Sequence, residues 1–151
     1  MANIVKTEVD IALQNKELVQ YFTKTLWERR NIDVIDDCFI AEAKIFSPFN
    51  VKYGSLTMRD IAEKWLTAFP DLIIKWQDFV AEREKVVVRW RANGTHLGSF
   101  FETSPTHHEV YYSGITIFTV QNDKITEYWS LVDIHSILKQ LGLDSMSEAI
   151  D

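Results

Sequence analysis

The sequence predicts an α+β fold in a single domain spanning residues 1–151. The chain has 151 residues, of which 46% are hydrophobic, enough for one sizeable core. Apolar residues recur with helical spacing as far as Pro70 and alternate with a spacing of two from Leu72 onward. Helices followed by antiparallel strands are typical of the α+β class. No linker rich in Pro, Gly or Ser and no internal repeat divides the chain.

The N-terminal residues predict two helices. Thr7 and Asp10 have the spacing of a capping box at the start of the first helix. Asn31 is a good N-cap for a short second helix. The apolar residues expected near one face of these helices are Ile11, Leu18, Phe22, Leu26, Ile32, Ile35 and Phe39. The only cysteine, Cys38, excludes a disulfide within the chain and is expected to be a small buried hydrophobe.

A short strand, a loop and a third helix are predicted next. The strand covers residues 43–47 and ends at Pro48, and the loop covers residues 49–55. Thr57 begins the third helix with a second capping box. That helix ends before Pro70, because the residue preceding a proline disfavours helical backbone.

The second half of the chain predicts four antiparallel strands and a closing helix. The strands are residues 72–81, 85–95, 110–120 and 125–132. Asn122 and Asp123 join the last two, because both residue types tolerate the positive φ of a tight hairpin turn. Asp133 then begins a short helix, which Gly142 stops.

Composition and charge exclude several functions. The net charge is −6 and no basic run exceeds Arg29-Arg30, which argues against a nucleic-acid partner. No apolar run approaches the roughly 18 residues of a membrane span. Residues 1–6 lack the long apolar segment of a signal peptide, so we expect a cytoplasmic protein. Adjacent His107 and His108 would point apart in a strand, so no metal site is expected.

Four stretches of the chain resemble a known family. They are Ala68-Phe69-Pro70-Asp71-Leu72, Val87-Val88-Arg89-Trp90, Gly94-Thr95-His96-Leu97-Gly98 and Lys124-Ile125-Thr126-Glu127-Tyr128-Trp129. Together they resemble the SnoaL-like polyketide cyclases, and within them the ester cyclase branch, of the nuclear transport factor 2-like superfamily. The resemblance covers residues 15–142. It implies a cone-shaped domain whose helices cover the concave face of a bent antiparallel sheet, with a deep apolar cavity between them and no cofactor.

Strand alternation and the resemblance together indicate which side chains face that cavity. The resemblance places Gly114, Thr116, Tyr128 and Ser130 on the cavity side. We expect a buried pocket of several hundred Å³, the usual size of a small-molecule site. The ligand-binding residues expected in it are Phe22, Phe46, Trp90, Tyr112, Thr116 and Ser130.

The catalytic groups of the family's aldol cyclases are replaced in this chain. The resemblance aligns their acid/base Asp with Ser130, a His with Thr116 and a Gln with Gly114. It aligns an Asn on their first strand with a position near Phe46. A neutral hydroxyl cannot act alone as a general base.

Three other residues are therefore candidates for catalysis. His96 is the best available base, Tyr128 a hydroxyl donor and Asp133 the nearest carboxylate. The alternatives are a hydrogen bond from turn backbone for His96 and the N-cap of the last helix for Asp133.

Two functions are consistent with these residues. The first is a cyclase or isomerase acting on a polyketide-like or other carbonyl-bearing lipophilic small molecule. The second is a non-catalytic dimeric domain that binds a lipophilic ligand. The lack of the acid/base Asp favours binding or another chemistry, whereas His96 and Asp133 keep catalysis open.

The outer sheet face predicts a homodimer. Large apolar and aromatic side chains are expected to point outward there, together with arginine, as in interface cores. These outward residues are Tyr111, Ile115, Ile117 and Trp129, with Arg89, Arg91 and Glu127 among them. A two-fold dimer would cover this face. The alternative is that residues 143–151 fold back over it.

Overall fold

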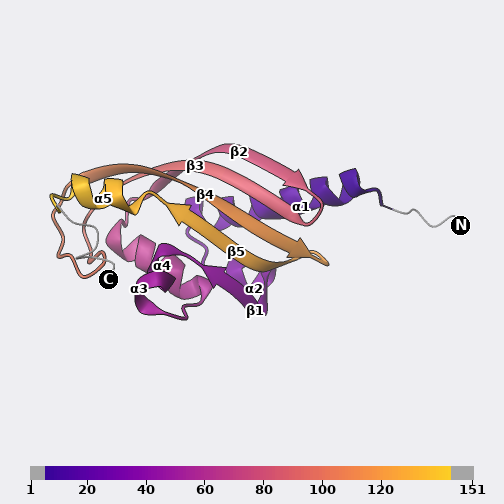
Figure 1. The fold of residues 1–151 in the computed structure, drawn as a ribbon, viewed down its shortest axis with the longest axis horizontal. Helices are drawn as coiled ribbons and strands as arrows, with labels where there is room; N and C mark the ends of the chain where they lie inside the picture. The colour runs from indigo at the N-terminus through magenta and orange to yellow at the C-terminus, as the bar shows by residue number, and fades with distance from the viewer. Residues whose placement is uncertain (1–5, 144–151) are drawn as a thin grey trace, which may run out of the picture.

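The computed structural model describes residues 6–143 and confirms the α+β class (Figure 1). Its elements are α1 (Glu8–Thr23), the π-helical segment η1 (Lys24–Glu28), α2 (Val34–Cys38), β1 (Phe39–Phe46), α3 (Pro48–Tyr53), α4 (Met58–Ala68), β2 (Ile73–Glu82), β3 (Lys85–Thr95), β4 (Glu109–Gln121), β5 (Lys124–Val132) and α5 (Ile134–Gln140). The strands form one sheet in the order β1-β5-β4-β3-β2. The pairing of β1 with β5 is parallel and the other three pairings are antiparallel.

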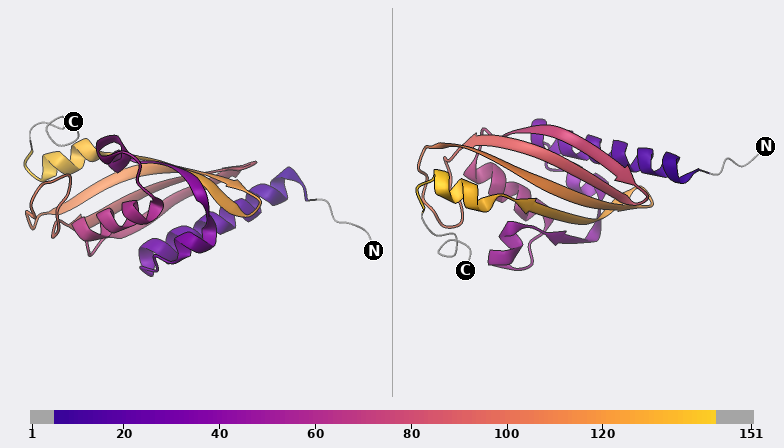
Figure 2. Two further views of the ribbon diagram at one scale, coloured as in Figure 1. Left: turned by 90° about the horizontal axis from the view of Figure 1, so that it is seen from below. Right: turned by 45° about the horizontal axis from the view of Figure 1, so that its top comes forward.

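The sheet is curved, and α1 and α4 lie along one of its faces (Figures 1 and 2). Helix α4 buries Ile61, Trp65 and Ala68 against that face, and the Trp65 ring stacks on Tyr112 of β4. The opposite face carries exposed side chains on β4 and β5. The core therefore lies between one sheet face and the helices, which is where a pocket can form.

Local sequence signals placed most element ends correctly. Capping boxes begin both α1 and α4, as their Thr and Asp residues predict. Asn122 and Asp123 both have positive φ in the β4–β5 turn. The Asp133 carboxylate accepts a hydrogen bond from the Ser136 backbone N–H at 3.1 Å and caps α5. These contacts are short in sequence, which is why the sequence specifies them.

Residues 48–53 form the helix α3, so the prediction of a loop there is wrong. Ser47 caps the helix by accepting the Asn50 N–H, and Pro48 occupies its first turn. Proline is well suited to that position, where a missing N–H carries no penalty. The Asn31 side chain accepts the Asp33 N–H, as an N-cap does. The α-helix nevertheless begins later than predicted, at Val34, because the intervening turns are closed by bonds to the residue three positions earlier.

Phe46 lies on the outer face, so its predicted place in the cavity is wrong. Strand β1 begins at Phe39, earlier than expected, and its pairing with β5 shifts between Phe39 and Lys44. Phe39 is buried, and Ala43 and Ile45, at even spacings from it, pack against the core. Alternation therefore puts Lys44 and Phe46 on the outer side of the strand. Phe46 pairs with Trp129 and is 48% exposed.

The other strands alternate as predicted. Inward residues are buried on β3, β4 and β5, among them Val88, Trp90, Tyr112, Thr116, Phe118, Tyr128 and Ser130. Cys38 is also buried, and burial raises the pKa of its thiol to about 11. The thiol therefore stays protonated at neutral pH and acts as a small apolar side chain, as the sequence predicted.

Candidate functional site

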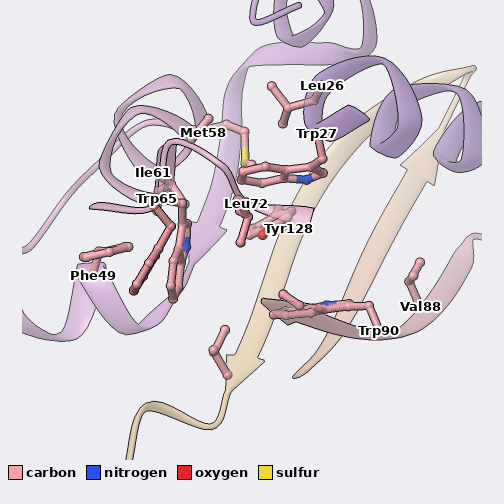
Figure 3. Close-up of a cluster of buried hydrophobic side chains, with 14 of the residues drawn as sticks. Leu26, Trp27, Phe49, Met58, Ile61, Trp65, Leu72, Val88, Trp90 and Tyr128 are labelled. Carbon is pink, nitrogen blue, oxygen red and sulfur yellow. The ribbon is translucent and has the colours of Figure 1, made fainter. Parts of the chain in front are cut away.

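An aromatic pocket lies between the inner sheet face and the helices (Figure 3). Its walls are Thr23, Trp27, Trp65, Leu72, Ile74, Trp76, Val88, Trp90, Tyr112, Thr116, Phe118, Tyr128, Ser130 and Val132. Figure 3 shows Trp27, Trp65 and Trp90 arranged around a common space bordered by Leu72 and Tyr128. Indole rings thus come to one place from η1, α4 and β3.

The pocket is narrower than predicted. The cavity between its walls has a volume of only about 30 Å³. That room accommodates one or two water molecules rather than a substrate. The large aromatic rings take up the volume that strand alternation alone left open. A ligand can enter only if part of the wall moves.

Five of the residues predicted from the sequence come together in this pocket. They are Trp90, Tyr112, Thr116, Tyr128 and Ser130. Phe22 is fully buried but lies behind the pocket wall, where its ring packs against Phe39 and Phe118 at centroid distances of 5.0 and 6.0 Å. It therefore supports the wall without lining the space.

The polar side of the pocket is a chain of hydrogen bonds across three strands. The Trp90 indole Nε1–H donates to Thr116 Oγ1 at 3.0 Å. Thr116 Oγ1 and Ser130 Oγ lie 3.2 Å apart, and either hydroxyl can donate to the other. Thr116 and Ser130 are cross-strand partners on β4 and β5. Register therefore sets the positions of these groups.

Both pocket tyrosines are neutral hydrogen-bond donors at physiological pH. Burial raises the pKa of Tyr128, against the opposing effect of the nearby Ser130 and Thr116 hydroxyls. Burial also raises the pKa of Tyr112, and the neighbouring Tyr128 adds to that rise. A phenol held neutral in this way can donate a proton in a hydrogen bond but is a poor base.

His96 lies outside the pocket, so its predicted position at the cavity rim is wrong. Its side chain is fully buried beside Phe69 and Phe100. Nδ1 accepts the Thr106 backbone N–H at 3.1 Å, which corresponds to the alternative considered from the sequence. Burial lowers the pKa of His96, and the backbone of Thr103 and Gly98 partly opposes that shift.

Asp133 also lies away from the pocket. It caps α5 and borders an open groove on the other side of the sheet with Phe46 and Trp129. In the part of the chain that the structure describes, no side chain lining the aromatic pocket is charged at neutral pH. The pocket consequently offers hydrogen-bond donors and aromatic surface, with no carboxylate or imidazole to accept a proton.

Two charged residues hold the outer part of the pocket wall. Glu28 Oε1 accepts the Trp76 Nε1–H at 3.0 Å. Arg30 donates to the backbone carbonyls of Trp27, at 2.6 Å, and of Leu72. The Glu28–Trp76 and Arg30–Leu72 contacts join residues more than 40 positions apart, so sequence patterns gave no sign of them. The only sequence signal that Trp76 and Leu72 line the pocket was their place near the start of an alternating strand.

The described residues hold no group of three or more His, Cys, Asp or Glu side chains able to bind a metal ion. Within residues 6–143, no helix combines the length and the apolar character needed to cross a bilayer.

Comparisons with known proteins agree with the observed fold. The sequence model of the SnoaL-like polyketide cyclase family matches residues 17–141. A proposed SnoaL-like polyketide cyclase from Jannaschia sp. CCS1 superposes with a TM-score of 0.77 at 18% identity, covering 95% of this chain and 100% of that one. IdmH, a proposed polyketide cyclase from Streptomyces antibioticus, superposes with a TM-score of 0.71 at 22% identity, covering 86% of this chain and 99% of that one. AclR, a proposed hydroxylase from Streptomyces galilaeus, superposes with a TM-score of 0.73 at 22% identity, covering 87% of this chain and 86% of that one.

No curated protein gave a significant match. The structural neighbours confirm the nuclear transport factor 2-like fold expected from the sequence motifs.

Proposed function

The chain belongs to the SnoaL-like polyketide cyclase family, and we propose that its aromatic pocket binds a neutral, carbonyl-bearing lipophilic molecule and promotes its cyclisation or isomerisation without a cofactor. A polyketide-like ketone or ester has this chemistry.

The uncharged, aromatic lining of the pocket is the observation that carries this proposal. Indole rings offer large flat surfaces on which a planar ligand can stack. A charged ligand would lose its hydration without gaining an ion pair, which is strongly unfavourable. The pocket also offers hydroxyl donors, which suit a neutral hydrogen-bond acceptor on the ligand. They belong to Tyr112, Thr116, Tyr128 and Ser130.

Such a pocket would act by conformation and by electrostatics. Close walls would hold a flexible substrate in a folded conformer, which brings its reacting carbons together. Hydroxyl donors would stabilise the negative charge that develops on a carbonyl oxygen when the enol form of the same substrate attacks the carbonyl carbon. The proton of the enol hydroxyl would move to that oxygen, so this step needs no base from the protein. Tyr128 is the donor that we place closest to this task, because its phenol lies beside both Thr116 and Ser130.

A second candidate function is binding without catalysis. It is favoured by the positions of His96 and Asp133, the two proposed proton acceptors, which are engaged in structural hydrogen bonds away from the pocket. Turnover of a carbonyl compound into a ring-closed or isomerised product of the same mass would favour the cyclase. Bound ligand released chemically unchanged would favour the binding domain.

The test of ligand class compares two probes of similar size. Acetophenone is neutral and carries a carbonyl, whereas benzoate carries a charge on the same ring. We expect acetophenone to bind and benzoate to bind at least about tenfold more weakly, because tenfold corresponds to only about 1.4 kcal/mol of unpaid desolvation. Isothermal titration calorimetry measures both. Equal or tighter binding of benzoate would contradict a neutral-ligand pocket.

We also propose that the domain is a homodimer joined through the outer sheet face. Trp129 is 38% exposed and Leu131 is 60% exposed on this face, and Phe46 lies beside them in the open groove. Contiguous apolar surface of this kind is uncommon on monomers. The alternative was that residues 143–151 fold back over this face. Residues 144–151 lie outside the described part of the chain.

A further inference from the structure

The Trp90 indole lies against the β4 backbone at Gly114, its direct cross-strand partner. A Cβ atom at position 114 would lie 2.4 Å from Trp90 Cζ2 and 2.7 Å from the Leu131 carbonyl oxygen. These separations are impossible for real atoms, so a side chain at this position would displace the indole and press on the β5 backbone. Gly114 therefore creates the space in which the Trp90 ring can reach Thr116, two residues further along β4.

The indole fixes the polarity of the hydroxyl pair. An indole N–H can only donate, so Thr116 Oγ1 must accept the bond from Trp90. Thr116 and Ser130 have two hydroxyl protons between them and use one in their mutual bond. Whichever of the two donates, one proton is left over. Both residues line the pocket, and the N–H already occupies an acceptor site on Thr116.

We propose that Trp90 is a positioning residue that turns the Thr116–Ser130 hydroxyl pair into a net hydrogen-bond donor toward the ligand, and that Gly114 makes this possible. The inference rests on the proposed function, because it assumes that the ligand occupies the aromatic pocket. It adds the property on which the pocket selects. A ligand that presents a carbonyl oxygen to the pair is preferred over one of the same shape that presents a methylene.

Chained hydrogen bonds strengthen one another, and this gives Trp90 an effect beyond its contact surface. Accepting the indole N–H makes the Thr116 hydroxyl a better donor, either to the ligand or to Ser130. Without the indole, water or a neighbouring hydroxyl can donate into the pair, and its preference for an acceptor weakens. Trp90 therefore controls the ligand's polar contact through two other residues.

The experiment measures how strongly the pocket prefers a carbonyl. Acetophenone and ethylbenzene have the same carbon skeleton, and the preference is the ratio of their dissociation constants. We compare this ratio in wild type, in Trp90→Phe, which removes the N–H donor, and in Gly114→Ala, which pushes the indole away. Trp65→Phe is the matched control, because Trp65 lines the same pocket while its indole makes no hydrogen bond to the hydroxyl pair among the described residues.

We expect the carbonyl preference to fall about fivefold in Trp90→Phe and Gly114→Ala, within the range that one neutral hydrogen bond provides, and to stay within twofold of wild type in Trp65→Phe. The carbonyl ¹³C resonance of labelled acetophenone gives an independent signature. In the bound state it should lie at higher frequency in wild type than in Trp90→Phe, because a stronger hydrogen bond to the carbonyl oxygen raises this frequency.

The outcomes separate this inference from the function on which it rests. Wild type that binds neither probe overturns the proposed function and this inference with it. Wild type that binds acetophenone, with an unchanged preference and ¹³C shift in Trp90→Phe, overturns the role of Trp90 alone. If Trp90→Phe does not fold, Gly114→Ala decides, because it keeps the indole, moves it off Thr116 and should lower the preference equally. A retained preference there is equally fatal to the inference.

Discussion

Replacing Thr116 by valine should destabilise the fold by about 2 kcal/mol. Valine keeps the shape of threonine but deletes the oxygen that accepts the Trp90 N–H and bonds Ser130. Both Trp90 and Thr116 are buried, so the indole N–H loses its protein partner in the interior. A buried polar group left unsatisfied costs about 1–3 kcal/mol. The exchanged methyl group offsets little of this, because the volume is unchanged.

Urea unfolding followed by far-ultraviolet circular dichroism measures the effect. The midpoint should fall without a change in the slope of the transition, since the area exposed on unfolding is the same. In thermal unfolding the loss corresponds to roughly 4–8 °C for a domain of this size. Thr116→Ser is the control, because it keeps the hydroxyl and removes only a methyl group, and it should lose about half as much or less.

A double-mutant cycle with Trp90→Phe isolates the hydrogen bond. Phenylalanine removes the N–H that Thr116→Val leaves unsatisfied, so the double variant should be about 1 kcal/mol more stable than the sum of the two single losses. Strict additivity would mean that the N–H and the hydroxyl do not interact in solution. That result would refute the hydrogen-bonded chain on which the site is built.

Three further predictions concern pH, ligand exchange and assembly. Burial lowers the pKa of His96 below its ordinary 6.5, so stability should be full above that pH and decline as pH falls through it. His96→Asn should flatten this decline in urea unfolding, and an equal slope in both proteins would contradict it. Glu28→Ala removes the acceptor of the Trp76 N–H and should speed acetophenone release several-fold by NMR exchange, whereas Glu28→Gln should not. Wild type should have a dimeric mass by light scattering and Trp129→Glu a monomeric one; a monomeric wild type would exclude the outer-face dimer.

Much of the fold was predictable because its signals are local. Capping boxes, the Asn122-Asp123 turn and the Asp133 cap depend on residues a few positions apart. Strand alternation placed Trp90 on the inner face correctly, and the family resemblance did so for Thr116 and Ser130. The period of two then fixes a whole strand once one residue is assigned. The parts of the site that lie on long, regular strands could therefore be predicted.

The remaining features depend on contacts that the sequence does not encode locally. Phe46 was assigned to the wrong face because residues 43–47 carry a large apolar residue on each face, Ile45 and Phe46, and packing against the core selects Ile45. The narrow pocket results from indole rings contributed by distant segments, so its volume follows from packing alone. His96 was misplaced because the backbone of a later loop holds its ring at Thr106. Polar groups with partners far along the chain were the least predictable.

The indole ¹H–¹⁵N resonances of the five tryptophans test the central claim most directly, because they report on the pocket and on the outer face in one spectrum. Trp27, Trp65, Trp76 and Trp90 line the pocket, whereas Trp129 lies on the outer face. Titration with acetophenone should shift the four pocket resonances together with one affinity and leave that of Trp129 in place. Shifts confined to Trp129, or a spectrum that does not change, would contradict a ligand site between the helices and the sheet.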